Sequence, residues 1–172
     1  MSVQAIDGVD PQAMRRTLGA FSTGVAVVAT ETKRGLFGMT VNSLTSVSLK
    51  PPVLLVCLQE GARTTEAVAE RRAFTVSILG QRQDAIANRF AQPGEDRFAG
   101  LDLHRTPSGL PFIPKSLALA ECAVTETFNQ GDHDIVLGRV VHCVTREGAP
   151  LVFFRSRYHD VVEQGRPANW YW

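Results

Sequence analysis

The sequence predicts a mainly β protein: a closed or nearly closed antiparallel barrel with a few short helices at its periphery. About six or seven runs of β-prone residues are joined by short, hairpin-like connections. Strands and helices do not alternate regularly, as a doubly wound parallel sheet would require. Closing an antiparallel sheet also removes its unpaired edges. The chain has 172 residues, 44% hydrophobic and 20% charged. It is therefore expected to form one domain over residues 1–172, with a core over about 10–160.

The first part of the chain predicts a helix, a hairpin and an apolar strand, in that order. Asp10 can cap a helix, and Pro11 suits its first turn. Residues 24–43 contain two β-prone runs that turn at Lys33–Gly35. After the KPP tripeptide, residues 53–58 (VLLVCL) form a continuous apolar strand, which we expect to be covered on both faces.

The second part of the chain alternates short helices and strands around one irregular segment. Helices are expected over 64–72 and 83–91, and strands over 73–79, 116–130, 133–147 and 150–156. Residues 92–115 hold much of the proline and glycine of the chain, yet they also contain large apolar side chains. An irregular segment of this length predicts a functional loop or a covering flap rather than a linker.

Charge and composition exclude several classes of protein. A formal net charge of +1 lacks the strong basic bias of a nucleic-acid-binding protein. No apolar run approaches the roughly 20 residues that span a bilayer, and the N-terminus has no apolar signal core. Cys57, Cys122 and Cys143 lie in apolar or alternating runs and are expected to be reduced core residues. We therefore expect a cytoplasmic protein that binds no metal, membrane or nucleic acid.

The hydroxyl-rich stretch from Thr40 to Ser48 is the first candidate site. The chain has no GxGxxG, GxxxxGK[ST], HExxH or nucleophile-elbow motif, so an enzyme of this sequence would take its chemistry from a cofactor. Strand alternation breaks after Val41, which predicts a turn or bulge over Asn42–Thr45. Such a bend presents N–H and hydroxyl groups that suit a polar ring edge or a phosphate. The alternative is a Ser/Thr-rich turn bonded to its own backbone.

Four further positions could bind a nucleotide, and each also has a purely structural interpretation. Arg63 precedes Thr64 at a helix start, where backbone N–H groups favour phosphate. Arg89–Phe90 adds a guanidinium group and a stacking face. His133 opens a strand and could bond a nucleotide amide or relay a proton. Residues 155–158 (RSRY) could contact a pyrophosphate and a ring, or form a strand with solvated arginines.

In this order, the segments MTVNSLTSVSLKPPVLLVCL, ART, RFA, GDHDIVLGRV and PLVFFRSRY resemble the flavin reductase-like domain family. More narrowly, they resemble the small NAD(P)H:flavin oxidoreductases that supply reduced flavin to two-component monooxygenases. The resemblance extends from about Asp10 to Tyr158. It implies an FMN-binding split β-barrel, an antiparallel fold that forms a homodimer with flavin near the interface. It also implies FMN or FAD, NADH or NADPH as electron donor, and a separate oxygenase partner.

The resemblance assigns roles to individual residues of this chain. It implies flavin contacts from Asn42, Ser43, Leu44, Thr45, Ser46, Ser48, Cys57, Leu58, Gln59, Arg63, Thr64, Arg89 and Phe90. It implies contacts to the pyridine nucleotide from His133, Arg155, Ser156, Arg157 and Tyr158. His133 is the candidate catalytic residue, which orients the nicotinamide or shuttles a proton.

Two other functions stay open for the same scaffold. One is a flavoprotein reductase of another acceptor, such as a corrinoid, and the other is a non-enzymatic flavin-binding barrel. The aromatic tail GRPANWYW, residues 165–172, is expected to pack on the barrel or on a partner subunit.

Overall fold

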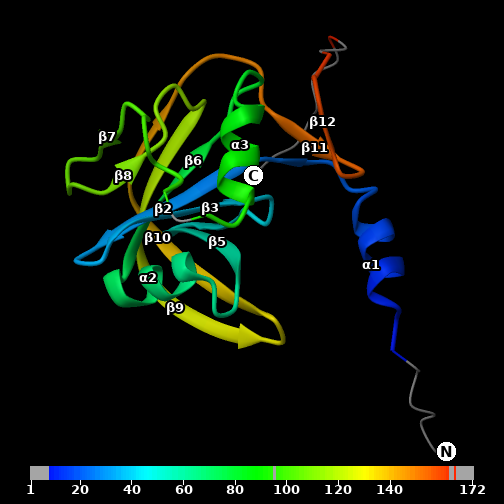
Figure 1. Cartoon of the computed structure of the whole chain (residues 1–172), viewed down its shortest axis with the longest axis horizontal. Helices are drawn as coiled ribbons and strands as arrows, with labels where there is room; N and C mark the ends of the chain where they lie inside the picture. Colours follow the sequence, from blue (N-terminus) through cyan, green and yellow to red (C-terminus); the bar gives the residue numbers. More distant parts are fainter. Residues whose placement is uncertain (1–7, 95, 163–164, 166–172) are drawn as a thin grey trace, which may run out of the picture.

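The structure is a computed structural model of the chain and describes residues 8–94, 96–162 and 165 (Figure 1). The aromatic end of the tail, residues 166–172, lies outside the described residues. Strands dominate the described part, as the sequence predicts. The elements are, in chain order, α1 (Pro11–Leu18), β1 (Thr23–Gly24), β2 (Ala26–Thr32), β3 (Gly35–Val41), β4 (Thr45–Leu49), β5 (Pro52–Gln59), α2 (Arg63–Arg71), β6 (Ala73–Ile78), α3 (Asp84–Ala91), β7 (His104–Arg105), β8 (Pro111–Phe112), β9 (Ala118–Gln130), β10 (His133–Thr145), β11 (Val152–Phe154) and β12 (Arg157–His159).

Seven strands form one antiparallel sheet in the order β3-β2-β6-β9-β10-β5-β4. Strands β2 and β3 form the predicted first hairpin, which turns at Gly35 with a φ of +121°. Strands β9 and β10 form the second hairpin, which turns at Gly131 with a φ of +67°. Glycine adopts both values without steric strain. The prediction of a mainly β, antiparallel fold with few helices is confirmed.

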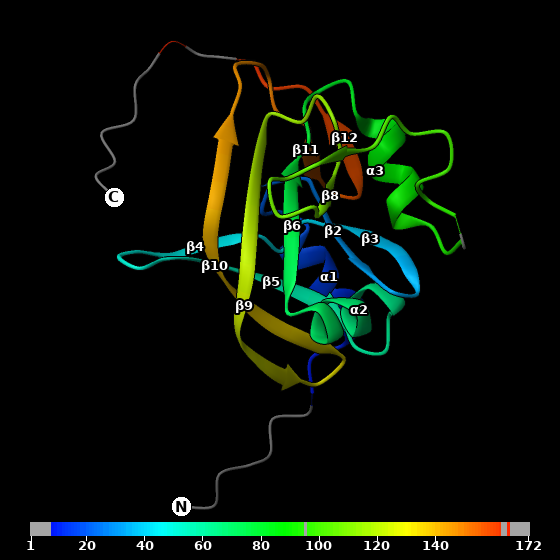
Figure 2. The same cartoon turned by 90° about the vertical axis from the view of Figure 1, so that its left-hand side faces the viewer.

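The long β9–β10 hairpin is bent by two register shifts, at Leu137/Gly138 and at Val140/His142. Gly138 permits the bend, because a Cβ there would lie 2.7 Å from Phe74 Cζ and 2.8 Å from Cys122 Cβ. As a result, β10 pairs with β5 only over His133–Arg139. Figure 2 shows the outcome: β9 and β10 run upright, while the β4–β5 hairpin projects to one side.

Curvature of the sheet brings the end of β3 against β5. The Ser43 hydroxyl donates to the Cys57 carbonyl oxygen at 2.9 Å and accepts from the Cys57 N–H at 3.0 Å. The face of the sheet enclosed by this curvature carries one apolar cluster, which includes Val28, Val56 and Phe74. Because β3 and β5 lie beside each other, residues from both strands line the cavity described below.

Burial of the strands differs from the sequence prediction at one point. Residues 53–58 of β5 were expected to be covered on both faces, and this expectation is wrong: Val56 and Leu58 are fully buried, whereas Leu55 and Cys57 are only half-buried. Among the described residues, no helix packs across the second face of β5. The strands buried on both faces are β2 and β6. The second face of β2 packs against α3 and the segment that follows α3, and the second face of β6 lies under the same segment.

The cysteines are also less uniform than predicted. Cys122 is a buried core residue, and burial raises the pKa of its thiol to about 12. Cys57 is half-buried, and Cys143 is exposed because nothing in the described residues covers that part of β10. All three are free thiols, so the expectation of reduced cysteines agrees with the structure, but the expectation of three core positions is wrong for Cys143.

Helix α1 forms where the sequence predicts it, but it packs on nothing that the structure describes. The Asp10 carboxylate accepts from the N–H groups of Gln12 and Ala13, both at 3.2 Å. None of the helix residues is buried, and Met14 and Leu18 are more than half exposed. Figure 1 shows α1 projecting from the body of the molecule. No helix in the described ranges is long and apolar enough to cross a membrane.

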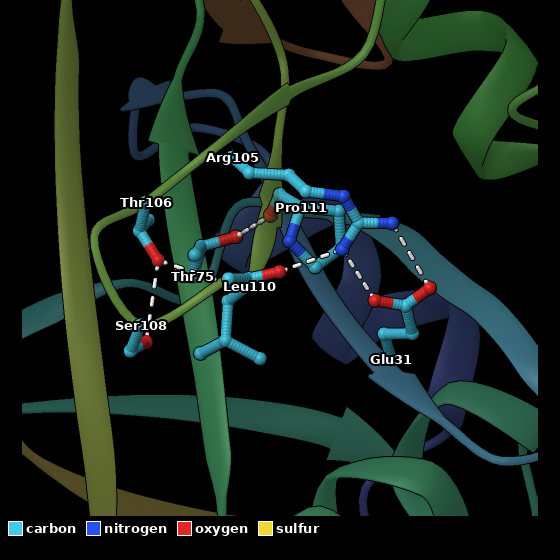
Figure 3. Close-up of polar contacts among 8 residues, drawn as sticks. Glu31, Thr75, Arg105, Thr106, Ser108, Leu110 and Pro111 are labelled. Carbon is cyan, nitrogen blue, oxygen red and sulfur yellow. Dashed lines mark hydrogen bonds and ion pairs between the residues drawn. The ribbon is translucent and has the colours of Figure 1, made fainter.

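The irregular segment 92–115 is a packed cover, as predicted. Phe98, Leu110 and Ile113 are each at least nine-tenths buried. Strands β7 and β8 within it form a small hairpin over β2 and β6 (Figure 3). Thr75 of β6 donates its hydroxyl to the Pro111 carbonyl oxygen at 2.6 Å, and the hairpin is tied to β2 by an ion pair. The segment therefore extends the core over β2 and β6.

Strands β1, β11 and β12 form a separate three-stranded antiparallel sheet. The predicted strand over residues 150–156 corresponds to β11, which pairs with β12 after a tight turn. Arg155 and Ser156 make this turn with φ values of +48° and +61°. The sheet joins the main body through Tyr158, whose hydroxyl donates to Asn88 Oδ1 of α3 at 3.3 Å.

Candidate functional site

A cavity of about 850 Å³ opens between β3, the end of β5, the start of α2 and the segment that follows α3. This volume suits a ligand of the size of a cofactor. The lining residues are Leu36, Phe37, Gly38, Met39, Thr40, Val41, Asn42 and Ser43 from β3 and its end, Cys57, Gln59, Gly61, Ala62, Arg63 and Thr64 from β5 and α2, Phe90, Ala91, Pro93, Gly94, Arg97 and Phe98 from α3 and the following segment, and His133.

One wall of the cavity is aromatic. Phe90 and Phe98 meet edge to face with ring centroids 4.8 Å apart. Both rings pack onto Gly38, where a Cβ would stand only 2.9 Å from an atom of each. Phe37 of the same strand also contributes to the lining. This wall can pack against a planar ring system and exclude water from it.

The hydroxyl groups at the end of β3 are bonded to protein backbone. Thr40 donates to the Ala87 carbonyl oxygen at 2.7 Å, and Ser43 is bonded to both backbone groups of Cys57. For these two residues the interpretation as backbone-bonded hydroxyls is correct, although both still line the cavity. The exposed side chain of Asn42 and the side chain of Gln59 provide amide groups at the same edge.

Helix α2 begins at the cavity, and its N-terminus has no side-chain cap. Ala62 occupies the N-cap position and can offer no acceptor to the first N–H groups. Arg63 and Thr64 follow it, and both line the cavity. Free N–H groups and the positive end of the helix dipole favour an anion at this position. The predicted phosphate-side residues are therefore brought to the cavity.

Arg97 is a cavity residue that the sequence analysis missed. Its Nη1 donates to the Gly38 carbonyl oxygen at 2.6 Å, and its Nε is buried with no hydrogen-bond partner among the described residues. Desolvation lowers the pKa of Arg97, and the nearby charge of Arg63 lowers it further. The only sequence signal was an arginine beside an apolar residue, Phe98, in the proline- and glycine-rich segment.

The charge of the lining is positive. Arg63, Arg97 and His133 are its basic side chains, and none of the described lining residues is an aspartate or glutamate. His133 Nδ1 lies 2.8 Å from Asp132 Oδ1, and this hydrogen bond lowers the pKa of the Asp132 carboxyl group. With Nδ1 bonded to the carboxylate, Nε2 is the nitrogen left to bond a ligand.

Several predicted site residues do not line the cavity. Leu44 packs against the enclosed core and Leu58 is buried in it, because Leu58 points away from the face that holds Cys57. Thr45, Ser46 and Ser48 lie in β4 at the edge of the sheet. Arg89 donates to the Ala99 carbonyl oxygen. For these residues a flavin contact stays a prediction.

The predicted pyridine-nucleotide residues are not gathered in one place. Arg155, Ser156, Arg157 and Tyr158 belong to the three-stranded sheet, and only His133 lines the cavity. Tyr158 contacts Asn88 of α3, while Phe90 of the same helix faces the cavity. A nucleotide contact from residues 155–158 stays a prediction.

Comparison with known proteins connects this cavity to one family. The family described as Flavin reductase like domain matches residues 18–161. The reductase subunit HsaB of a flavin-dependent monooxygenase from Rhodococcus jostii is 33% identical over 96% of this chain and 86% of its own length. The FMN reductase (NADH) SmoA from Agrobacterium fabrum is 39% identical over 85% of this chain and 83% of its own.

A solved structure extends the similarity to the fold. The NADH:FAD oxidoreductase SgcE6 of Streptomyces globisporus C-1027, in complex with NAD and FAD fragments, superimposes with a TM-score of 0.84 at 33% identity. The alignment covers 94% of this chain and all of that one. This chain spans only 42% and 59% of the length of two Rhizobium meliloti relatives, named "Probable flavin reductase" and "Stachydrine N-demethylase reductase subunit Stc3".

Proposed function

This chain belongs to the Flavin reductase like domain family, and on that premise we propose that it is an NAD(P)H-dependent flavin reductase. It transfers hydride from NADH to FMN or FAD, and the reduced flavin serves a separate monooxygenase component. The observation that carries the proposal is a cavity with an aromatic wall and a cationic end, in a chain whose relatives are named as NADH-dependent reductases of flavin.

The residues around the cavity fit a phosphorylated flavin. Phe90 and Phe98 offer an apolar wall for the ring system, and Asn42 and Gln59 offer amide groups for its polar edge. The start of α2 offers N–H groups, together with Arg63, for a phosphate. When bound, the flavin supplies the hydride-accepting ring. The chain itself then has to position two rings and exclude water, and positioning accounts for most of the acceleration in such a transfer.

His133 has a separate part in the proposal. Asp132 bonds Nδ1 and so sets the orientation of the imidazole ring. Nε2 then bonds the nicotinamide carboxamide or relays a proton at the edge of the cavity. The half-exposed side chain of His133 suits a ligand that enters and leaves.

Three finer features belong to the same proposal. The curved sheet closes as a split β-barrel, which the bonds between Ser43 and Cys57 support. The functional unit is a homodimer, which is supported by apolar side chains that are at least half exposed in the single chain, namely Val47, Leu49, Phe128 and Val141. The compartment is the cytoplasm, where an exposed free thiol such as Cys143 stays reduced.

The test is oxidation of NADH and NADPH by the purified chain, with and without FMN, FAD or riboflavin, followed by the absorbance of the reduced nicotinamide. The proposal expects rapid oxidation that depends on added flavin. Flavin binding without oxidation would favour a non-enzymatic flavin-binding protein. Oxidation only after a second acceptor is supplied, with flavin retained through purification, would favour a reductase of that acceptor.

Replacement of His133 separates an enzyme from a binding protein. His133→Asn is expected to lower kcat/KM for NADH about tenfold, the scale of one lost hydrogen bond, and to change the Kd of FMN less than about twofold. The matched control is His104→Asn, because His104 has a similar neighbouring carboxylate in Asp102, at 3.5 Å, but does not line the cavity. Equal rates for both variants and the wild type would remove His133 from the mechanism.

A further inference from the structure

We propose that the Ser43 hydroxyl is a positioning group for hydride transfer, which ties the β3 wall of the cavity to the β5 wall. The inference rests on the proposed function and deepens it. It also changes the role of Ser43, to which the resemblance assigns a flavin contact. The hydroxyl is used within the protein, and the flavin ring meets the walls that it holds together.

Ser43 lies where the two edges of the seven-stranded sheet approach each other. Strands β3 and β4 occupy opposite edges of that sheet, yet only residues 42–44 separate them in the chain. In a flat sheet of seven strands the edges would be about 29 Å apart, at about 4.8 Å per strand spacing. The chain from Val41 to Thr45 can span at most about 14 Å. The sheet must therefore curl, and Ser43 is the middle residue of the link between its edges.

The Ser43 hydroxyl takes the place of a backbone pair at this seam. Strand β4 pairs with β5 from Thr45 opposite Leu55, and the same register, continued by two residues, sets Ser43 opposite Cys57. There the hydroxyl donates to the Cys57 carbonyl oxygen at 2.9 Å and accepts from the Cys57 N–H at 3.0 Å. In the described part of the chain, no other hydrogen bond joins β3 and its end to β5. One side chain therefore connects the two walls.

The tie reaches the residues proposed for both rings of the reaction. Asn42 precedes Ser43, and Gln59 lies two residues after Cys57; their amide groups are those offered to the flavin edge. Gln59 is in turn paired with His133 across β5 and β10. The distance between Ser43 and Cys57 thus sets where the β3 groups lie relative to His133. A misplacement of about 1 Å in such a site can lower a rate about a hundredfold.

The other fixed points of β3 do not involve β5. The Thr40 hydroxyl donates to the Ala87 carbonyl oxygen of α3 at 2.7 Å, and Arg97 donates to the Gly38 carbonyl oxygen. Strand β5 is held separately by its ladder with β10. Without the Ser43 hydroxyl, both walls would keep these attachments, and only the gap between them would be free to change. Its removal should therefore alter the cavity while the fold is retained.

The first experiment compares Ser43→Ala, which removes the hydroxyl, with Ser43→Thr, which keeps one. The matched control is Ser116→Ala, because Ser116 is a buried serine whose hydroxyl donates to the Ile113 carbonyl oxygen at 2.8 Å, and it does not line the cavity. Steady-state oxidation of NADH gives kcat at saturating FMN and NADH. Flavin fluorescence gives the Kd of FMN.

The expected result is a loss in kcat that exceeds the loss in affinity. Ser43→Ala should lower kcat about tenfold and raise the Kd of FMN less than about threefold, because the binding groups remain but their relative position changes. Ser43→Thr should stay within about threefold of the wild type in kcat, since it can make the same bonds. Ser116→Ala should match the wild type in both quantities.

A second measurement follows the tie without flavin or NADH. Burial raises the pKa of the half-buried Cys57 thiol, so a released wall should expose this thiol and increase its thiolate fraction. Iodoacetamide labelling, quantified at each cysteine by mass spectrometry, should be about fivefold faster at Cys57 in Ser43→Ala than in the wild type. The exposed Cys143 is the internal control and should be labelled at the same rate in both.

Three results would overturn the inference and leave the proposed function intact. A kcat of Ser43→Ala equal to that of the wild type would remove the positioning role. Equal losses in Ser43→Ala and Ser116→Ala would show a general effect of losing a buried hydroxyl. A raised Kd with unchanged kcat would make the Ser43 hydroxyl a flavin-binding group. A wild type that oxidises no NADH with any flavin would instead remove the proposed function, and the positioning role with it, whereas labelling of Cys57 would still report on the tie itself.

Discussion

The segment between α3 and β9 has two halves, whose polar side chains differ in hydrogen bonding. In the hairpin half, residues 104–112, the polar groups find partners within the protein. Arg105 bonds Glu31, and Thr106 accepts from the Leu110 N–H at 3.1 Å (Figure 3). Ser108 donates to Glu121. In the cavity half, residues 92–103, Arg97 keeps a buried donor without a partner in the described chain.

Burial alone does not distinguish the two halves. Phe98 of the cavity half is 7% exposed and Leu110 of the hairpin half is 1% exposed, so each half is anchored by a large apolar side chain. The difference lies in hydrogen bonding. The polar side chains of the hairpin half named above are bonded within the protein, whereas the buried Arg97 Nε of the cavity half has no partner among the described residues. The comparison separates a half that lines the cavity from a half that covers β2 and β6.

Truncation of the two anchors should have the largest effect and separates the halves. Phe98→Ala and Leu110→Ala each remove a buried side chain, so each should lower the free energy of unfolding by about 2–4 kcal/mol. Only Phe98→Ala should also weaken FMN binding, because Phe98 lines the cavity and Leu110 does not. Urea unfolding measures the first quantity, and flavin fluorescence titration measures the second.

Equal losses of FMN affinity in the two variants would contradict the division into halves. That result would mean that the whole segment moves as one unit, with any local loss transmitted to the cavity. The FMN titrations are made without urea and at a temperature well below the Tm of each variant, so that only folded proteins are compared.

The sequence predicted most of the fold because the signals were local. Gly35 and Gly131 marked both hairpins, and Asp10 marked the start of α1. The sequence analysis expected β5 to be covered on both faces, and this was wrong. The second face of β2 is covered by α3 and the segment that follows it, and no local pattern in either strand records that contact. Exposure of α1 and of Cys143 likewise depends on what packs nearby.

The site was predicted only in part, for a related reason. Hydroxyl groups occur on both sides of the bend after β3, but only those at its start, such as Ser43, reach the cavity, while Thr45 and Ser46 continue into the edge strand β4. Composition cannot distinguish the two sides of a bend. Arg97 was missed because its role depends on Gly38, a distant residue whose carbonyl oxygen fixes the guanidinium.

Removal of the Thr75 hydroxyl should have an intermediate effect, confined to the hairpin half. Thr75 is fully buried and donates to the Pro111 carbonyl oxygen. Thr75→Val keeps the shape of the side chain but leaves this buried acceptor without its donor, which should lower the free energy of unfolding by about 1–3 kcal/mol. The Kd of FMN should stay within about twofold of the wild type, because neither residue lines the cavity.

The control for this variant is Thr17→Val. The Thr17 hydroxyl donates to the Ala13 carbonyl oxygen at 3.0 Å on the exposed helix α1. Water can replace that bond, so the expected change in unfolding free energy is within about 0.5 kcal/mol. Similar losses in both variants would show that the hydroxyl of Thr75 contributes no more than a surface hydroxyl does.

The ion pair between Glu31 and Arg105 should have the smallest effect and a distinctive pH dependence. Arg105 bonds both carboxylate oxygens of Glu31, one of them at 3.0 Å, and the hydrogen bond from Arg105 lowers the pKa of Glu31 below its ordinary value of 4.5. The Glu31 side chain is 34% exposed, so solvent screens the pair. Glu31→Gln should therefore lower the free energy of unfolding at neutral pH by less than about 1 kcal/mol.

The sign of the pH dependence follows from the direction of the shift. Because the pKa of Glu31 is lower in the folded chain than in the unfolded one, the pair stabilises the protein above pH 4.5, and this contribution disappears as the pH falls through the lower folded value. Urea unfolding of wild type and Glu31→Gln should thus give a constant difference from neutral pH down to about 5, which shrinks toward zero in more acidic solution. A difference that stays constant through the acidic range would mean that the amide substitution disturbs packing of the hairpin half instead of removing a charge. FMN affinity should be unchanged at every pH at which both proteins are folded, since Glu31 and Arg105 belong to the half of the segment that does not line the cavity.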